Sequence, residues 1–270
     1  MCTLEHLEVW GLTSRLLPRF VEATEFVVYV PEFQVDKFLE VTDSAVTVLS
    51  EDLLGEAFSC KLRNAVRATG NLSRYGWYLQ QFNKIEALLQ SDCDSLVIWD
   101  ADCVPVHDIE LFDEKGRPVY MNATEFNANY FESIDKLLGL SKIRSESFIV
   151  PSFPIYREWV RDLISYIEMR FGGLPWYDAI IASTDLSLGA GFSEFETLGT
   201  WVSHKYPESW TTGLQKWERF GQSRFGYAQD LTADQLVNIG ENAKLDLISF
   251  ESWDRPSVRN HLRNFINRIV

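Results

Sequence analysis

A short apolar segment, Leu96 to Trp99, runs directly into two aspartates, Asp100 and Asp102, with only Ala101 between them. An unbroken apolar run of this length, bounded by polar residues, is typical of a strand buried on both faces of a parallel sheet. Acidic side chains rarely enter such a core, so both should lie where the strand leaves it. The pattern therefore predicts an interior strand with an acidic pair at its C-terminal end.

The chain before this segment alternates between strand and helix patterns. We predict helices over 5–20, 33–39 and 77–90 and strands over 25–31 and 45–49. The apolar stripe of the 77–90 helix leaves Lys84 off its face. The stretch 56–75 has no pattern that assigns it to either class. Strand, helix and strand joined by short connections are typical of an α/β fold.

The chain after the acidic pair continues the alternation of strand and helix patterns. Strands are predicted over 118–122, 148–150 and 245–250, and helices over 131–140, 154–171, 176–183 and from 254 toward the end. Glycines at 189 and 191 precede a further helix that begins at Ser193. The stretch 206–227 has no clear periodicity, which predicts a long loop.

Composition and charge narrow the class of protein. At 270 residues with 46% hydrophobic content, the chain is long enough for one large α/β domain. A net charge of −14 argues against general nucleic-acid or anionic-membrane binding. An anionic ligand therefore requires a local cation, which is either a metal or a small basic cluster such as Arg63, Arg67 and Arg74.

The four cysteines have no C-x-x-C pair and no metal-ligand spacing, so we expect reduced thiols. No apolar run approaches the length of a membrane span, and the N-terminal residues lack the basic and apolar regions of a signal peptide. The expected location is cytoplasmic, either free or peripheral to the inner face of a membrane.

Two carboxylates on one turn are able to reach a single hard cation, and oxygen-only ligands favour Mg²⁺ or Mn²⁺. The alternative is that Asp100 and Asp102 only cap a turn after a strand, as aspartate often does.

The order of these features resembles the nucleotide-sugar-dependent glycosyltransferases of the GT-A fold. A helix with Lys84, an apolar strand, the acidic pair, a proline and then Leu111 and Phe112 follow one another as in glycogenin-type enzymes. The segments 76–81 and 192–196 resemble small bacterial glycosyltransferases of surface-polysaccharide synthesis. The resemblance covers roughly residues 20–205. It implies a GT-A-like (Rossmann-like) α/β fold with a mostly parallel central sheet flanked by helices.

The same resemblance implies one domain over 1–270, with a donor-binding half over about 1–122 and an acceptor-binding half and tail over about 123–270. Asp102 would bind Mn²⁺ or Mg²⁺, and Asp100 the metal or the donor ribose. Lys84 would neutralise donor charge with Arg63, Arg67 or Arg74, unless these three arginines are only solvated. The implied partners are a nucleotide-sugar donor and a saccharide or lipid-linked saccharide acceptor. His204 lies where such enzymes often place a late metal ligand, although a surface histidine is the alternative.

Two glutamates near the start of the 193 helix require separate interpretations. Ser193 and Glu196 fit a capping box, in which Glu196 reaches back to the amide of Ser193. Glu194 has no such structural role, so it is the candidate base that takes a proton from an acceptor hydroxyl. It would otherwise complement the helix dipole. Asp178 and Asp185 are alternative bases.

Three rival functions use the same acidic pair or the same fold. In a HAD-like phosphatase, Asp100 would be the nucleophile and Asp102 the general acid. That class normally has the motif near the N-terminus and a paired acidic motif downstream, which this chain lacks. A nucleotidyltransferase would need a glycine-rich N-terminal phosphate loop, which is also missing. A non-catalytic carbohydrate-binding protein would tolerate loss of metal binding.

Overall fold

The computed structural model describes residues 2–255, which form two compact units. Among the described residues, the first unit comprises 2–51, 99–111 and 214–255, and the second comprises 52–98 and 112–213. The units interleave along the chain, so the predicted division near residue 122 does not coincide with their boundaries. The helix predicted from 254 onward lies almost wholly outside the described residues.

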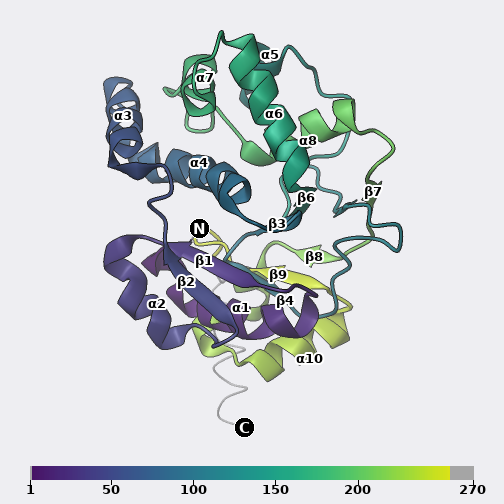
Figure 1. Ribbon diagram of the computed structural model, residues 1–270. Coiled ribbons are helices and arrows are strands. Elements are labelled where there is room, and N and C mark those ends of the chain that lie inside the picture. Colours follow the sequence, from purple (N-terminus) through teal and green to yellow (C-terminus); the bar gives the residue numbers. More distant parts are fainter. Residues whose placement is uncertain (1, 256–270) are drawn as a thin grey trace. The chain divides into compact units, whose positions relative to one another are not determined.

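The first unit contains two small sheets with helices packed on them (Figure 1). Strands β1 and β2 pair in parallel, with Phe26 opposite Val46. Strand β9 lies between β4, which is antiparallel to it, and β8, which is parallel. The elements are η1 (Leu4–His6), α1 (Leu7–Phe20), β1 (Phe26–Val30), η2 (Glu32–Gln34), α2 (Val35–Val41), β2 (Val46–Ser50), β4 (Cys103–Pro105), β8 (Trp217–Glu218), α9 (Gly221–Phe225), η4 (Ala228–Asp230), α10 (Ala233–Ala243) and β9 (Leu247–Ser249).

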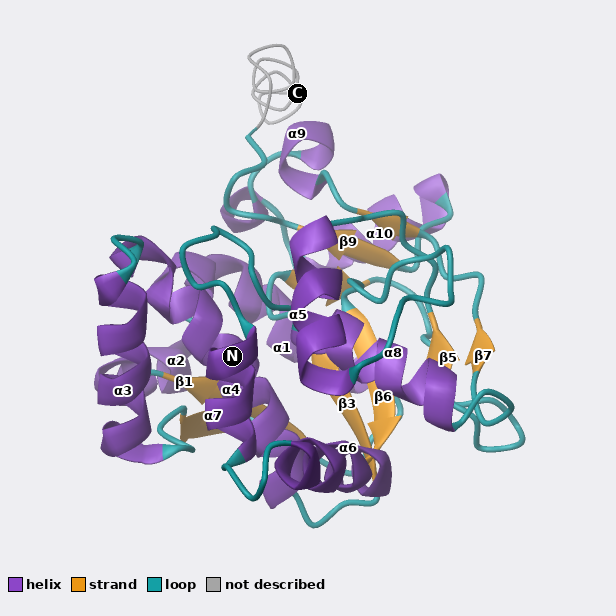
Figure 2. Ribbon diagram, turned by 90° about the horizontal axis from the view of Figure 1, so that it is seen from above, coloured by secondary structure: helices purple, strands orange, loops and turns teal. Residues whose placement is uncertain are grey.

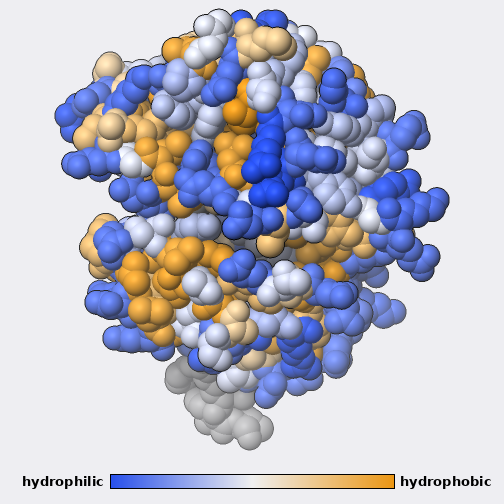
Figure 3. All heavy atoms as spheres, in the orientation of Figure 1, coloured by the Kyte–Doolittle hydropathy of each residue, from blue (hydrophilic) through white to orange (hydrophobic). Residues whose placement is uncertain are grey.

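Helix α1 holds this unit together because two of its faces are apolar. One face packs Leu12 and Leu16 against Val104 and Ile248 of β4 and β9. The other places Trp10 in a cluster with the β1 and β2 side chains. On the face that Figure 3 shows, hydrophobic residues also gather at the surface over the region of β1 and β2.

The second unit is mainly helical. Figure 2 shows β3 beside β6 and β5 beside β7, and the β5–β7 pair is parallel. The elements are α3 (Gly55–Ala68), η3 (Leu72–Arg74), α4 (Tyr75–Gln90), β3 (Ser95–Trp99), β5 (Val119–Tyr120), α5 (Ala128–Leu138), β6 (Ser152–Tyr156), α6 (Arg157–Arg170), α7 (Trp176–Ser183), α8 (Glu194–Lys205) and β7 (Thr211–Thr212). Phe82 of α4 lies within 6 Å of the rings of Phe58, Trp176 and Phe192, so aromatic packing joins four segments of this unit.

The predicted α/β class is confirmed, and parallel strand pairs are present. The prediction of an interior strand over 96–99 is wrong in one respect. Strand β3 exists, but in the described part of the chain it pairs only with β6, and only Ile98 of the strand is fully buried. The described strands form small sheets of two or three members rather than one continuous central sheet.

Two boundary predictions are also wrong. Residues 148–150 are irregular, and the strand is β6, which includes Pro154, so helix α6 begins only at Arg157. Burial of the Phe153 and Ile155 side chains favours the strand. Pro154 is compatible with it, because a strand tolerates proline where the backbone amide is not needed for pairing. Among the described residues, no helix is both long enough and apolar enough to cross a bilayer.

Candidate functional site

The acidic pair lies on a tight turn between β3 and β4 in the first unit. The amide of Cys103 donates to the carbonyl of Asp100 at 3.0 Å and closes the turn. Thr13 of α1 donates its hydroxyl to the carbonyl of Ala101 at 3.1 Å, which ties the middle of the turn to the core. Ala101 is buried, whereas Asp100 and Asp102 are half-buried on either side of it. The backbone of the turn is therefore fixed while both carboxylates stay near the surface.

A third carboxylate, that of Glu251, lies next to this turn. The amide of Phe250 donates to the carbonyl of Asp102 at 2.8 Å, which extends the β4–β9 pairing and brings Glu251 beside the aspartates. Burial raises the pKa of the Glu251 carboxyl from 4.5 to about 6, and the negative charges of Asp102 and Asp100 add to the effect. The Arg219 guanidinium, 3.2 Å away, opposes it. The three acidic groups therefore act on one another electrostatically.

The sequence reasoning missed Glu251 because the predicted strand over 245–250 stopped one residue short of it. A usable signal was present. The apolar run into Phe250 followed by an acidic residue repeats, in weaker form, the pattern of Leu96 to Asp100.

The donor atoms at this turn suit a cation that is only partly coordinated by protein. Within residues 2–255, no group of three or more histidine, cysteine, aspartate or glutamate side chains is arranged to hold a metal ion. Mg²⁺ usually keeps several waters and binds through one or two carboxylates together with substrate phosphates. Asp100 and Asp102, both half-buried on this turn, are the residues that would hold such a cation. His204 instead lies in the second unit, with its Nε2 2.8 Å from the carbonyl oxygen of Ser141.

In the second unit, the structure brings together two of the predicted site residues, Lys84 and Glu194. Lys84 Nζ lies 2.8 Å from Glu194 Oε1, and the two side chains are only 10% and 6% exposed. The ammonium also lies 4.4 Å from the ring centroid of Phe195. The prediction that the Glu194 side chain has no structural partner is therefore wrong. The first turn of α8 is buried, and a carboxylate placed there needs a counter-charge.

The capping-box prediction for α8 is half right. Ser193 caps the helix, since its hydroxyl accepts from the amide of Glu196 at 3.2 Å. The Glu196 side chain does not reach back to Ser193. Its carboxylate accepts from the Ser147 hydroxyl at 2.6 Å and the Phe148 amide at 3.2 Å, and Lys142 lies 3.5 Å away. Glu196 thus ties α8 to the segment before β6.

Two of the three candidate arginines of the second unit lie over aromatic rings. The Arg63 guanidinium lies over the ring of Tyr75 at 4.7 Å, and Arg74 lies over Trp77 at 4.3 Å. Arg67 is exposed in the last turn of α3.

The two alternative bases also have partners. Asp178 pairs with Lys61 at 2.5 Å. Asp185 accepts from the hydroxyl and amide of Ser187, and these hydrogen bonds lower the pKa of its carboxyl.

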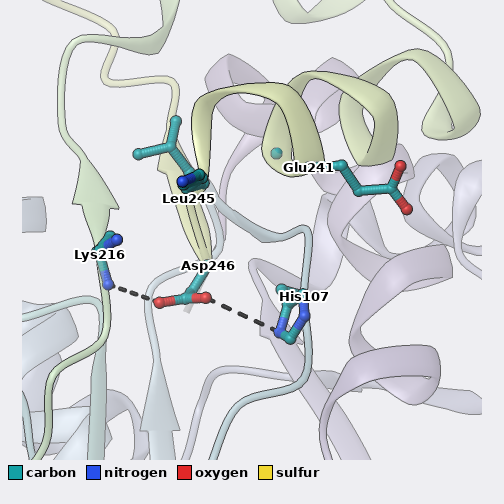
Figure 4. A pocket seen from close by; sticks show the side chains of 7 residues that line it. His107, Lys216, Glu241, Leu245 and Asp246 are labelled. Carbon is teal, nitrogen blue, oxygen red and sulfur yellow. Dashed lines mark hydrogen bonds and ion pairs between the residues drawn. The ribbon is translucent and has the colours of Figure 1, made fainter.

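Figure 4 shows a pocket in the first unit, and its lining residues do not include Asp100, Asp102 or Glu251. Its volume is about 410 Å³, and His107, Lys216 and Asp246 contribute to its lining. Asp246 accepts from the amide of Lys216 at 2.7 Å and lies 3.8 Å from His107 Nδ1. The Asp246 carboxylate thus has a structural role, because it accepts a hydrogen bond from the backbone of Lys216. The pocket is open to solvent, unlike the enclosed cavities that usually bury most of a small molecule.

Residues 14–239 match the model of a protein family described as "Family of unknown function (DUF6492)". The chain belongs to the DUF6492 family. The matched stretch of this DUF6492 chain includes Lys84, both aspartates of the turn and Glu194, and it ends before Glu251. No curated protein matches the sequence.

Two solved structures are similar to this DUF6492 chain at low identity. Mouse xyloside xylosyltransferase 1 in its apo form is 10% identical, with a TM-score of 0.44 over 93% of this chain and 94% of the other. The bifunctional glycosyltransferase WbbM is 13% identical, with a TM-score of 0.43 over 100% of this chain and 48% of the other. The chain thus spans about half the length of WbbM. At these values, neither similarity assigns this chain an activity.

Proposed function

We propose that this chain is a glycosyltransferase that uses a nucleotide-sugar donor and a divalent cation, Mn²⁺ or Mg²⁺. One observation carries the proposal: the Asp100 and Asp102 carboxylates flank a rigid turn, with Glu251 beside them. Carboxylates gathered in this way repel one another, so binding of a cation is favourable there. The sequence resemblance to GT-A glycosyltransferases supports the same conclusion.

A cation held by the Asp100 and Asp102 carboxylates would help a nucleoside diphosphate to leave the donor sugar. When the sugar leaves, negative charge develops on the phosphate that was bonded to it, and a divalent cation bound there stabilises that charge as a Lewis acid. Asp100 and Asp102 would hold the cation through oxygen atoms only, which favours Mg²⁺ and Mn²⁺ over softer metals. The proposed acceptor is a saccharide or a lipid-linked saccharide.

The proposal assigns separate roles to the two glutamates of α8. Glu194 would accept the proton of the acceptor hydroxyl, and its ion pair with Lys84 would hold the carboxylate in one position. Under this assignment, Glu194→Gln keeps donor and metal affinity but lowers turnover by about 10²-fold or more. Glu196→Gln, as the control, keeps most of its turnover, because the amide oxygen still accepts from Ser147 and Phe148. Full turnover in Glu194→Gln would remove the base assignment without affecting the metal site.

A thermal-shift screen tests the donor and the metal together. Wild-type protein is incubated with UDP-, GDP-, dTDP- and CMP-sugars, each with Mn²⁺ and with EDTA. We expect at least one donor to raise the melting temperature only when Mn²⁺ is present. Asp102→Asn should lose that shift, whereas Asp108→Asn, which changes an exposed aspartate of the same unit, should keep it. Stabilisation that survives EDTA or Asp102→Asn would contradict the proposed metal site.

A further inference from the structure

Two large aromatic side chains are exposed in the unit that contains the acidic turn. Trp253 is 53% exposed and Phe220 is 50% exposed. Their ring centroids lie 5.7 Å apart at an interplanar angle of 81°, so the rings meet edge to face. Indole and phenyl groups normally contribute most to stability when they are buried. A paired, exposed arrangement therefore offers apolar surface to something outside the folded unit.

Hydrogen bonds hold the indole in place. Glu251 Oε2 accepts from Trp253 Nε1 at 2.9 Å, and Oε1 accepts from Arg219 Nε at 3.2 Å. The Arg219 guanidinium carbon lies 5.6 Å from the ring centroids of both Trp217 and Trp253, within the range of a cation–π contact. Because the indole is fixed before any ligand arrives, a ligand that stacks on it loses little affinity to ordering of the side chain.

The indole is also close to the proposed metal site along the backbone. The amide of Phe250 bonds to the carbonyl of Asp102 at 2.8 Å, and Trp253 follows three residues later. Three residues span at most about 10 Å even when fully extended. A nucleotide bridges a comparable distance between its phosphate and the far edge of its base. The Trp253 ring is thus within reach of a nucleotide whose phosphates lie at Asp100 and Asp102.

We propose that Trp253 is the stacking platform for the base of the nucleotide donor, with Phe220 bounding one edge of the base. This assignment rests on the proposed glycosyltransferase function, whose donor it places. A base suits the platform better than a pyranose ring does. The exposed surface is aromatic, and each Glu251 oxygen already accepts a hydrogen bond from within the cluster. A sugar would bring several hydroxyl groups that need polar partners, whereas a base needs mainly a flat face.

The test compares ligands with and without a base. The affinities of UDP, GDP, ADP, CDP and dTDP, of the corresponding nucleotide sugars and of pyrophosphate are measured by calorimetry with Mn²⁺. The proteins are wild type, Trp253→Ala, Trp253→Phe, Asp102→Asn and the control Phe33→Ala, which removes another aromatic ring that is 84% exposed in the same unit. Circular dichroism verifies that each variant is folded.

We expect Trp253→Ala to bind the preferred nucleoside diphosphate about 5- to 150-fold more weakly, the equivalent of ~1–3 kcal/mol for one stacked base. Trp253→Phe should recover most of the affinity, and Phe33→Ala should bind as wild type does. Pyrophosphate should bind equally to wild type and Trp253→Ala, because it has no base to stack.

The possible failures are distinguishable. Equal nucleotide affinity in Trp253→Ala and wild type, with binding still lost in Asp102→Asn, would overturn only the stacking proposal. A loss confined to the nucleotide sugars would overturn it too, since the indole would then contact the transferred sugar. Equal weakening of pyrophosphate would show that the substitution disturbs the metal site instead of removing a stacked base. Absence of nucleotide binding by wild type would overturn both this assignment and the proposed function.

Discussion

Replacing Lys84 with methionine removes the positive partner from a buried ion pair and should destabilise the protein strongly. The N–O distance is 2.8 Å, and the Glu194 side chain is only 6% exposed. At an effective dielectric constant of about 20, two unit charges at that distance attract by roughly 6 kcal/mol before desolvation is counted. Leaving one charge buried without its partner typically costs about 3–5 kcal/mol. We expect Lys84→Met to lose that amount from the free energy of unfolding.

Urea unfolding followed by tryptophan fluorescence measures the cost, and a double-mutant cycle isolates the pair. The double variant Lys84→Met/Glu194→Gln leaves neither charge buried without its partner. Its loss of unfolding free energy should therefore be smaller, by at least roughly 2 kcal/mol, than the sum of the losses in the two single variants. Lys61→Met is the matched control. Its pair with Asp178 is also short, 2.5 Å, but the Lys61 side chain is 54% exposed, so the expected cost is below about 1 kcal/mol.

Two outcomes would refute the reasoning. One is a Lys84→Met variant that loses no more stability than Lys61→Met. The other is strict additivity of the two substitutions at the buried pair, which would show that the two charges do not stabilise each other in solution.

Other predictions concern packing and pH. Gly199→Ala in α8 would place its methyl 2.1 Å from a ring carbon of Phe148, so the free energy of unfolding should fall by roughly 1–3 kcal/mol, whereas Gly76→Ala, with no atom within 4 Å, should not be destabilised. The pKa of Glu251 rises from 4.5 to about 6 on folding. The preference of the folded protein for the protonated carboxyl therefore adds to the free energy of unfolding below pH 4.5, and this contribution is lost as the pH rises through 6. In EDTA, the free energy of unfolding of Glu251→Gln should therefore rise by roughly 2 kcal/mol relative to that of wild type as the pH increases from 4.5 to 7. Unfolding curves at several pH values measure the difference, and a difference independent of pH would contradict the shift.

The features that could be predicted from the sequence are those set by residues close to one another along the chain. The strand over 96–99, the acidic turn after it and the N-cap Ser193 all follow from local patterns of apolar runs, small residues and capping side chains. The interpretation of 56–75 as a stretch without a pattern is wrong, because Phe58, Leu62 and Val66 repeat every four residues and are the buried residues of α3. In that stretch the periodic signal was present and the interpretation missed it.

Long-range contacts were not predictable in the same way. The ion pair between Lys84 and Glu194 joins residues far apart in sequence, and nothing near either residue specifies the other. Glu251 approaches Asp102 only because β9 pairs with β4, and strand pairing across such a separation leaves no local pattern. The candidate site therefore required the three-dimensional structure for its third carboxylate and for the indole beside it.

Consumption of a nucleotide sugar is the most direct test of the central claim. Wild-type protein is incubated with each of the four donor classes, and released or transferred sugar is quantified by mass spectrometry with Mn²⁺, with Mg²⁺ and with EDTA. The account predicts turnover of at least one donor with the metal, loss of turnover in EDTA and in Asp102→Asn, and retention in Asp108→Asn. Turnover that is equal with and without the metal, or a fully active Asp102→Asn variant, would contradict it.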